Sequence, residues 1–174
     1  MLNSCPVVNM FRFAENKKYR KLFIVTGFVV FFDQLTKAVI LYSLPLYSFI
    51  SVIPGFFRIT HIHNTGGAFG FLANQSPILR SLVFIFVSIL AIGVIFYLYM
   101  NTPGTHRFLA TGFALIFGGA LGNMIDRIRI GKVVDFLDFY IKNLHWPAFN
   151  VADSAISAGI LIFIFHLLFK KLPK

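Results

Sequence analysis

Four long apolar segments constrain the fold of this 174-residue chain more than any other feature. They cover Leu22–Tyr42, Ser81–Met100, Phe108–Ile125 and Val151–Phe169. A bilayer core about 30 Å thick requires about 20 apolar residues in a helix, and within it a single segment satisfies its backbone polar groups only as a helix. Charged residues make up 13% of the chain, about half the share in soluble domains. The sequence therefore predicts an α-helical membrane protein with four transmembrane helices.

The connections between these segments indicate how the helices are arranged. The second and third segments are joined by Asn101–Arg107, which contains Pro103-Gly104 and predicts a tight antiparallel hairpin. The other two connections, Ser43–Arg80 and Asp126–Asn150, are long. No internal repeat or low-complexity segment divides the chain, so we expect a single domain over residues 1–174.

Two parts of the long connections favour extended structure. Phe57–Asn64 alternates in polarity as a strand does, and the turn residues Thr65-Gly66-Gly67 follow it. Val133–Phe136 is a second, shorter candidate. We therefore expect a small extracytoplasmic β-cradle beside the helices.

Basic residues predict the orientation of the chain in the membrane. An even number of spans places both termini on one side, and the basic residues of that side cluster at the ends of the first and last segments. The termini side carries Arg12, Lys17, Lys18, Arg20, Lys21, Arg107, Lys170, Lys171 and Lys174, and the opposite side carries Arg58, Arg80, Arg127, Arg129, Lys132 and Lys142. This bias favours cytoplasmic termini. The placement of these basic residues at membrane flanks also argues against a nucleic-acid partner, despite a formal charge of +10.

The chain has only six acidic residues, and four of them fall in the stretch from Asp126 to Asp153. The predicted topology places all four on the outer face. Two carboxylates held close together share a proton, so that one activates a water molecule while the other donates to a carbonyl oxygen. Asp135 and Asp153 are the first candidates for such a pair, although spacing does not separate Asp135 from Asp138. Capping of the last helix by Asn150 or Asp153 is the alternative.

Other polar residues lie within or beside the apolar segments. Asn123 and Arg127 share one helix face, where an amide and a guanidinium suit a substrate backbone or headgroup. An Asp126–Arg127 pair is the structural alternative for that face. Asp33 and Lys37 are spaced for a buried ion pair within one helix.

Several further residues favour structural explanations. Gly118, Gly119 and Gly122 permit close helix packing. His61 and His63 share one face of the expected strand, but no further ligand has suitable spacing, so we expect no metal site. A single cysteine excludes an intrachain disulfide.

Five segments in order resemble the lipoprotein signal peptidase (signal peptidase II) family of bacterial intramembrane aspartyl proteases. The segments are Asp33-Gln34-Leu35-Thr36-Lys37, Asn64-Thr65-Gly66-Gly67-Ala68-Phe69-Gly70, Gly118-Gly119-Ala120-Leu121-Gly122-Asn123-Met124-Ile125-Asp126-Arg127, Val133-Val134-Asp135-Phe136 and Phe149-Asn150-Val151-Ala152-Asp153-Ser154. The resemblance extends from the first apolar segment to the fourth.

This resemblance implies roles that spacing leaves open. The catalytic pair of the family corresponds to Asp135 and Asp153, and Asp138 is then a bystander. The positions implied to contact substrate and inhibitors are Asn64, Asn123, Arg127 and Asn150, and those implied to support the fold or the site are Asp33, Lys37, Gly66, Gly122 and Asp126.

The resemblance also implies a substrate and a location. The substrate is a prolipoprotein with a diacylglyceryl group on a cysteine, and cleavage falls on the amino side of that cysteine. The first outer loop is expected to close over the site. The protein is expected to be a monomer without cofactors in the bacterial inner membrane, in contact with membrane lipid. Its active site is expected at the outer face, open to macrocyclic inhibitors such as globomycin.

Three other functions fit parts of the pattern. A small transporter or proton pathway would also keep acidic residues in a membrane. In a non-catalytic scaffold, the acids would cap helices and pair with Arg127 and Lys132. A metalloprotease would depend on His61 and His63.

Overall fold

The computed structural model describes residues 6–66 and 75–169. Four helices in this part of the chain are long and apolar enough to cross a membrane. They are α1 (Pro6–Ser43), α2 (Pro77–Asn101), α3 (Arg107–Ile130) and α4 (Val151–Phe169). The prediction of a four-helix membrane protein is confirmed. Within the resemblance, Gly67-Ala68-Phe69-Gly70 lies outside the described residues, as does the basic flank Lys170, Lys171 and Lys174. The first outer loop, which is expected to close over the site, is described except for residues 67–74.

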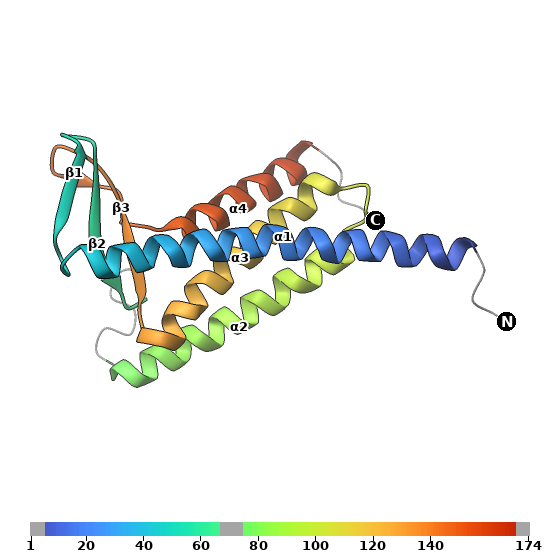
Figure 1. Ribbon diagram of the computed structural model, residues 1–174, viewed down its shortest axis with the longest axis horizontal. Coiled ribbons are helices and arrows are strands. Elements are labelled where there is room, and N and C mark those ends of the chain that lie inside the picture. The colour runs from blue at the N-terminus through green and yellow to red at the C-terminus, as the bar shows by residue number, and fades with distance from the viewer. Residues whose placement is uncertain (1–5, 67–74, 170–174) are drawn as a thin grey trace.

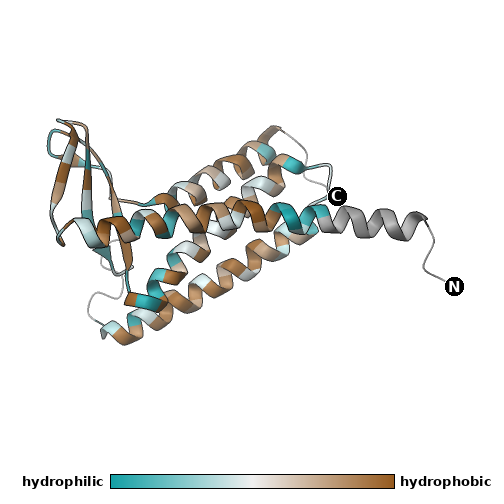
Figure 2. Ribbon diagram, in the orientation of Figure 1, coloured by the Kyte–Doolittle hydropathy of each residue, from teal (hydrophilic) through white to brown (hydrophobic). Residues whose placement is uncertain are grey.

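The helices form an elongated bundle with a small sheet at one end (Figure 1). The start of α1 and the end of α4 lie away from the sheet (Figure 1). Apolar residues dominate the middle of the helices, and hydrophilic residues gather toward the two ends of the bundle (Figure 2). Many large apolar side chains face outward, among them Phe23, Phe28, Ile89 and Leu161. A helix surface of this kind is suited to lipid rather than to water.

Helix α2 begins and ends at local signals in the sequence. Ser76 caps its first turn by accepting a hydrogen bond from the Leu79 N–H (3.2 Å), and Pro77 occupies the first helical position. The helix stops at Thr102, directly before Pro103, which cannot continue it. The chain then turns and α3 packs against α2, so the predicted hairpin is present.

Helix α3 continues to Ile130, five residues beyond the apolar segment expected to end at Ile125. Backbone hydrogen bonding extends a helix through polar residues until a capping position ends it. Here Gly131 adopts the left-handed conformation (φ 71°), and its N–H donates to the Arg127 carbonyl. Asp126 therefore lies inside α3 rather than at the start of a loop.

Helix α3 is central, since it packs against each of the other three helices. Glycines allow the close approach. A Cβ on Gly112 would lie 3.1 Å from the Gly159 carbonyl oxygen of α4, and one on Gly118 would lie 3.0 Å from the Val29 side chain of α1. This supports the packing role predicted for the small residues of α3.

The sheet is antiparallel, in the order β1 (Phe49–Ile53), β2 (Phe57–Asn64), β3 (Val133–Ile141) and β4 (Leu144–His145). Strands β2 and β3 are the two predicted extended segments, and β3 runs five residues further than expected. Strands β1 and β4 were not predicted. Both are short and exposed, so they lack the alternation of buried and exposed residues that marks a strand.

Candidate functional site

Asp135 is a buried carboxyl group on β3, where it lies opposite Ile62 of β2. Asp135 is only 2% exposed to solvent. Its two oxygens accept hydrogen bonds from the side-chain amides of Asn64 (3.0 Å) and Asn150 (2.7 Å). Burial, together with the nearby charge of Asp153, raises the pKa of Asp135 to about 6, although the two amides act in the opposite direction.

Asp153 is the third residue of α4 and takes part in capping that helix. The Asn150 Oδ1 accepts from the Asp153 N–H (2.9 Å), and the Asp153 Oδ2 accepts from the Asn150 N–H (3.3 Å). This reciprocal arrangement is a capping box. The other oxygen of Asp153 accepts from the Asn123 amide (2.7 Å). The alternative of helix capping is therefore present, but it occupies only one of the two oxygens.

Asn150 links the two aspartates through one side chain. Its amide nitrogen donates to Asp135 while its amide oxygen accepts from the backbone of Asp153. Asn150 is completely buried, so the link is shielded from water. The positions of Asp135 and Asp153 are thus coupled, although one lies on a strand and the other on a helix.

Asn123 connects this pair to the bundle. Its amide oxygen accepts from Lys37 Nζ (2.9 Å) and from Asn150 (3.3 Å), while its nitrogen donates to Asp153. Arg127 lies one turn further along α3, and its guanidinium donates to the Asn123 carbonyl (3.3 Å). Arg127 is partly exposed, which leaves its planar fork of donors accessible at the edge of the site.

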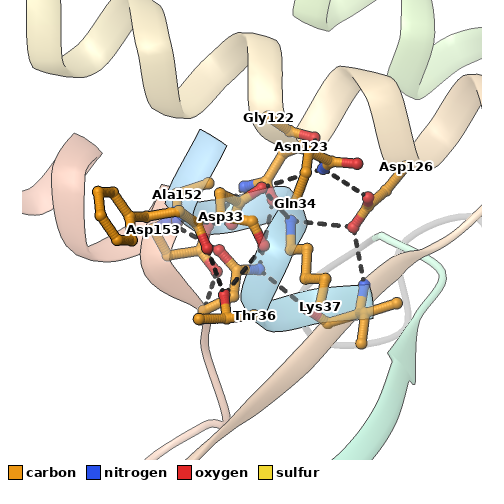
Figure 3. A network of polar contacts seen from close by, with 12 residues as sticks. Asp33, Gln34, Thr36, Lys37, Gly122, Asn123, Asp126, Ala152 and Asp153 are labelled. Atoms are coloured by element: carbon orange, nitrogen blue, oxygen red, sulfur yellow. Dashed lines mark hydrogen bonds and ion pairs between the residues drawn. The ribbon is translucent and has the colours of Figure 1, made fainter. Parts of the chain in front are cut away.

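A buried charge network lies beside this cluster (Figure 3). The Lys37 ammonium contacts Asp33 (2.8 Å) and Asp126 (2.9 Å), and all three residues are at most 4% exposed. The ion pair predicted between Asp33 and Lys37 is therefore present. Gln34 donates to Asp126 (3.0 Å) and to the Gly122 carbonyl (3.1 Å). Buried ions require such complete pairing, because an unpaired charge away from water is costly.

The network also holds the elements that carry the two aspartates. The Asp33 Oδ1 accepts from the Ala152 N–H (2.9 Å) at the start of α4. The Asp126 Oδ2 accepts from the Val134 N–H (3.2 Å), one residue before Asp135. The bundle thereby positions β3 and α4 through backbone hydrogen bonds.

The contacts of Asp126 correct one expectation from the sequence. Its direct partners are Lys37, Gln34 and the Val134 N–H, whereas the structural alternative drawn from the sequence paired it with the adjacent Arg127. Consecutive helical residues point about 100° apart, so the carboxylate faces α1 while the guanidinium points elsewhere.

Two glycines predicted to support the site sit where a side chain does not fit. A Cβ on Gly122 would lie 2.6 Å from Asp33 Oδ2. Gly66 has a φ of +80°, and a Cβ there would lie 2.6 Å from the Phe84 ring. The Gly66 N–H donates to the Asn64 Oδ1 (2.8 Å), which orients the Asn64 amide toward Asp135.

The remaining candidates have other partners. Asp138 is buried and pairs with Arg58 and His145. His61 and His63 contact each other through their Nε2 atoms (3.1 Å). Within residues 6–66 and 75–169, no group of three His, Cys, Asp or Glu side chains is arranged to hold a metal.

Two residues near the site were not singled out from the sequence. Gln34 bridges α1 and α3, and its only signal was its place beside Asp33 in the resemblance. Phe84 contacts Gly66 and lies under the Arg127 guanidinium, 5.9 Å from ring centroid to Cζ. Nothing distinguishes this phenylalanine in a chain that has 23 of them.

The chain is similar to proteins of one family over most of its length. A family model described as signal peptidase (SPase) II matches residues 25–169. A lipoprotein signal peptidase of Desulforapulum autotrophicum is 52% identical over 88% of this chain and 94% of that protein. One from Geobacter sulfurreducens is 50% identical over 80% and 85%, respectively. A bacterial membrane enzyme solved by the in meso method at 1.9 Å has a TM-score of 0.76 and 33% identity, over 86% of this chain and 94% of that one.

Proposed function

The chain belongs to the signal peptidase II family of membrane proteases, and from this membership we propose an aspartic endopeptidase mechanism for it. Its substrate is a diacylglyceryl-modified prolipoprotein, cleaved on the amino side of the lipidated cysteine. The reacting carboxyl groups belong to Asp135 and Asp153. The observation that carries this proposal is the coupling of both residues through the single buried side chain of Asn150.

The different surroundings of the two acids assign their roles. Asp135 is buried and has a raised pKa, so it carries the shared proton and donates it to the carbonyl oxygen of the scissile bond. Asp153 is more accessible and takes a proton from the attacking water. Water oxygen bonds to the carbonyl carbon, which gives a neutral tetrahedral diol.

Collapse of the diol completes the reaction. The carbon–nitrogen bond breaks, and the leaving nitrogen takes the proton that Asp153 acquired. A hydroxyl of the diol returns a proton to Asp135 as the carbonyl forms again. Both carboxyl groups return to their starting protonation states, and no covalent bond forms between the enzyme and the substrate.

The four substrate-binding positions implied by the resemblance divide into two kinds. Asn123 and Asn150 are buried and hydrogen-bonded to the aspartates, so we assign them to positioning. Asn64 and Arg127 are more accessible and are able to meet the substrate backbone. A macrocyclic inhibitor such as globomycin would occupy the same space between them and the aspartates.

The proposal includes a topology. The sheet lies at the end of the bundle away from the start of α1 and the end of α4 (Figure 1). Asp135 belongs to β3 of this sheet, and Asp153 lies in the first turn of α4. With cytoplasmic termini, this end reaches the outer membrane face, where water and the cleavage site meet. The protein is proposed to act as a monomer and a single domain.

The deciding experiment is cleavage of a diacylglyceryl-modified peptide by purified protein, compared with the same peptide without lipid. General acid–base catalysis contributes about 10²–10⁴-fold. We therefore expect Asp135→Asn and Asp153→Asn each to lower the rate at least about 100-fold while the protein stays folded.

Asp138→Asn is the matched control, because it removes a buried carboxylate from the same strand. It should retain most activity. Wild-type rates in either Asp135→Asn or Asp153→Asn would refute the catalytic pair and favour a scaffold. Loss of activity in a strong chelator would favour a metalloprotease instead.

A further inference from the structure

A second feature with the character of a binding site lies at the opposite end of the bundle from the aspartates. It is a cavity of about 540 Å³, within the size range of ligand pockets. Among the lining residues whose side chains the structure describes, half are basic and none is acidic; they are Lys17, Lys18, Arg20, Lys21, Tyr99, Thr102, Pro103, Gly104, Arg107 and Ala110. Lys17 and Lys37 are 20 residues apart on α1, which places this pocket about 30 Å from the aspartates.

Two of the lysines build the wall of the pocket. Lys18 donates to the carbonyls of Met100 (2.5 Å) and Thr102 (2.9 Å) at the end of α2. Lys21 donates to the Arg107 carbonyl at the start of α3. These bonds fasten α1 to the connection between α2 and α3. The Lys18 ammonium lies where a cation is favoured, at the C-terminus of α2.

The base of the pocket is formed by Tyr99. Tyr99 is completely buried, and its hydroxyl donates to the Lys18 carbonyl (2.8 Å). The Lys18 ammonium lies 5.7 Å from the centre of the Tyr99 ring. The pocket is thus a built cavity between three helices rather than a chance cluster of surface charges.

The arginines differ from these lysines in their surroundings. Arg20 and Arg107 are exposed at the pocket. A guanidinium presents a rigid fork of donors that matches two oxygens of a phosphate. Repulsion among several cations in one pocket is relieved when an anion binds between them.

The position of the pocket relative to the membrane indicates which anion it binds. Arg107 begins one of the candidate membrane spans, and Asn101 ends another. The pocket therefore lies at the boundary between hydrocarbon and headgroups, where lipid phosphates are concentrated. Basic pockets between transmembrane helices at this level bind anionic headgroups. The exposed ring of Pro103 suits the glycerol and first methylenes of a lipid rather than a free phosphate ion.

We propose that this pocket binds the phosphate headgroup of an anionic phospholipid, with Arg20 and Arg107 as its principal contacts. The site is distinct from the proposed peptidase site and does not depend on its chemistry. The bound lipid would fasten α1 to the α2–α3 connection at the termini end of the bundle.

Binding should be measured by native mass spectrometry of the full-length protein in detergent. The probes are dioctanoyl phosphatidylglycerol, the zwitterionic phosphatidylcholine of the same length, and soluble glycerol phosphate. Each basic residue near an anionic lipid contributes about 1 kcal/mol, or about fivefold in affinity. The double variant Arg20→Gln/Arg107→Gln should therefore bind phosphatidylglycerol about 25-fold more weakly.

Lys132→Gln/Lys142→Gln is the matched control, because it removes the same charge from the sheet end. It should leave phosphatidylglycerol binding unchanged. Arg20→Lys/Arg107→Lys keeps the charge and should retain the preference for phosphatidylglycerol, which separates loss of the site from loss of folding. Equal weakening in the test and control pairs, or equal binding of the two lipids, would overturn the proposal. Tighter binding of glycerol phosphate than of phosphatidylglycerol would also overturn it, in favour of a soluble phosphate ester.

Discussion

Replacing Asp135 with asparagine should change how the stability of the protein depends on pH. The pKa of this carboxyl group rises from its ordinary 3.8 to about 6 in the folded protein. Between these values the folded state binds a proton that the unfolded state has released. Stability therefore falls as the pH rises through this window and levels off above it. The asparagine variant lacks this titration.

The magnitude follows from the two pKa values. One pKa unit corresponds to about 1.4 kcal/mol, so the full cost of ionising Asp135 in the folded state is about 3 kcal/mol. About 2 kcal/mol of this cost develops between pH 4 and pH 8. An asparagine at this position also meets the donating amides of Asn64 and Asn150 and loses about 1 kcal/mol at every pH. That constant loss cancels when the two pH values are compared.

The assay is thermal unfolding in detergent at pH 4, 6 and 8 for the wild type and for Asp135→Asn. We expect the midpoint of the variant to gain roughly 4–8 °C relative to wild type between pH 4 and pH 8, at 2–4 °C per kcal/mol. Asp138→Asn, measured at the same three pH values, is the control for removal of another β3 carboxylate. Parallel pH profiles for the wild type and Asp135→Asn would refute the reasoning, because they would mean that Asp135 ionises in the folded protein as it does in water.

Three further predictions concern the supporting residues. Lys37→Met should destabilise the protein by about 3–5 kcal/mol, since it leaves the carboxylates of Asp33 and Asp126 buried without their cation; urea unfolding would measure this, and a loss below 1 kcal/mol would contradict it. Gly122→Ala should lower both stability and cleavage rate, because its Cβ would displace the Asp33 carboxylate, whereas unchanged kinetics would show that the helices adjust freely. Asp138→Asn should lower stability by about 1–3 kcal/mol while the cleavage rate per folded molecule stays near wild type, and a proportional loss of that rate would place Asp138 in the reaction.

Helices and strands were predictable to different degrees, for a physical reason. Hydropathy over 20 residues is a local property, so all four helices followed from the sequence. Their ends did not, because the last turn of α3 is polar and stops only at Gly131. Strands β1 and β4 were not predicted, because each is short and has no alternation of polar and apolar residues. Each forms by hydrogen bonding to its neighbour, β1 to β2 and β4 to β3.

The proposed catalytic pair was chosen only through the resemblance. Spacing alone left Asp135 and Asp138 equivalent, and the structure shows why they differ. Asp135 meets Asn64 and Asn150, whereas Asp138 is neutralised by Arg58. Asp135 and Asp138 are three positions apart on β3, and strand residues an odd number of positions apart point to opposite faces.

The sequence by itself determined that this chain enters a membrane, how many times it can cross, and which few polar residues it carries there. These conclusions depend on the free energy of transfer of each segment from water to lipid, which is set by the residues of that segment alone. The tertiary structure decided the partners: Asp126 with Lys37 rather than Arg127, and Asn150 between Asp135 and Asp153. Such pairings join α1, α3, β3 and α4, and they exist only once packing has brought distant parts of the chain within hydrogen-bonding distance.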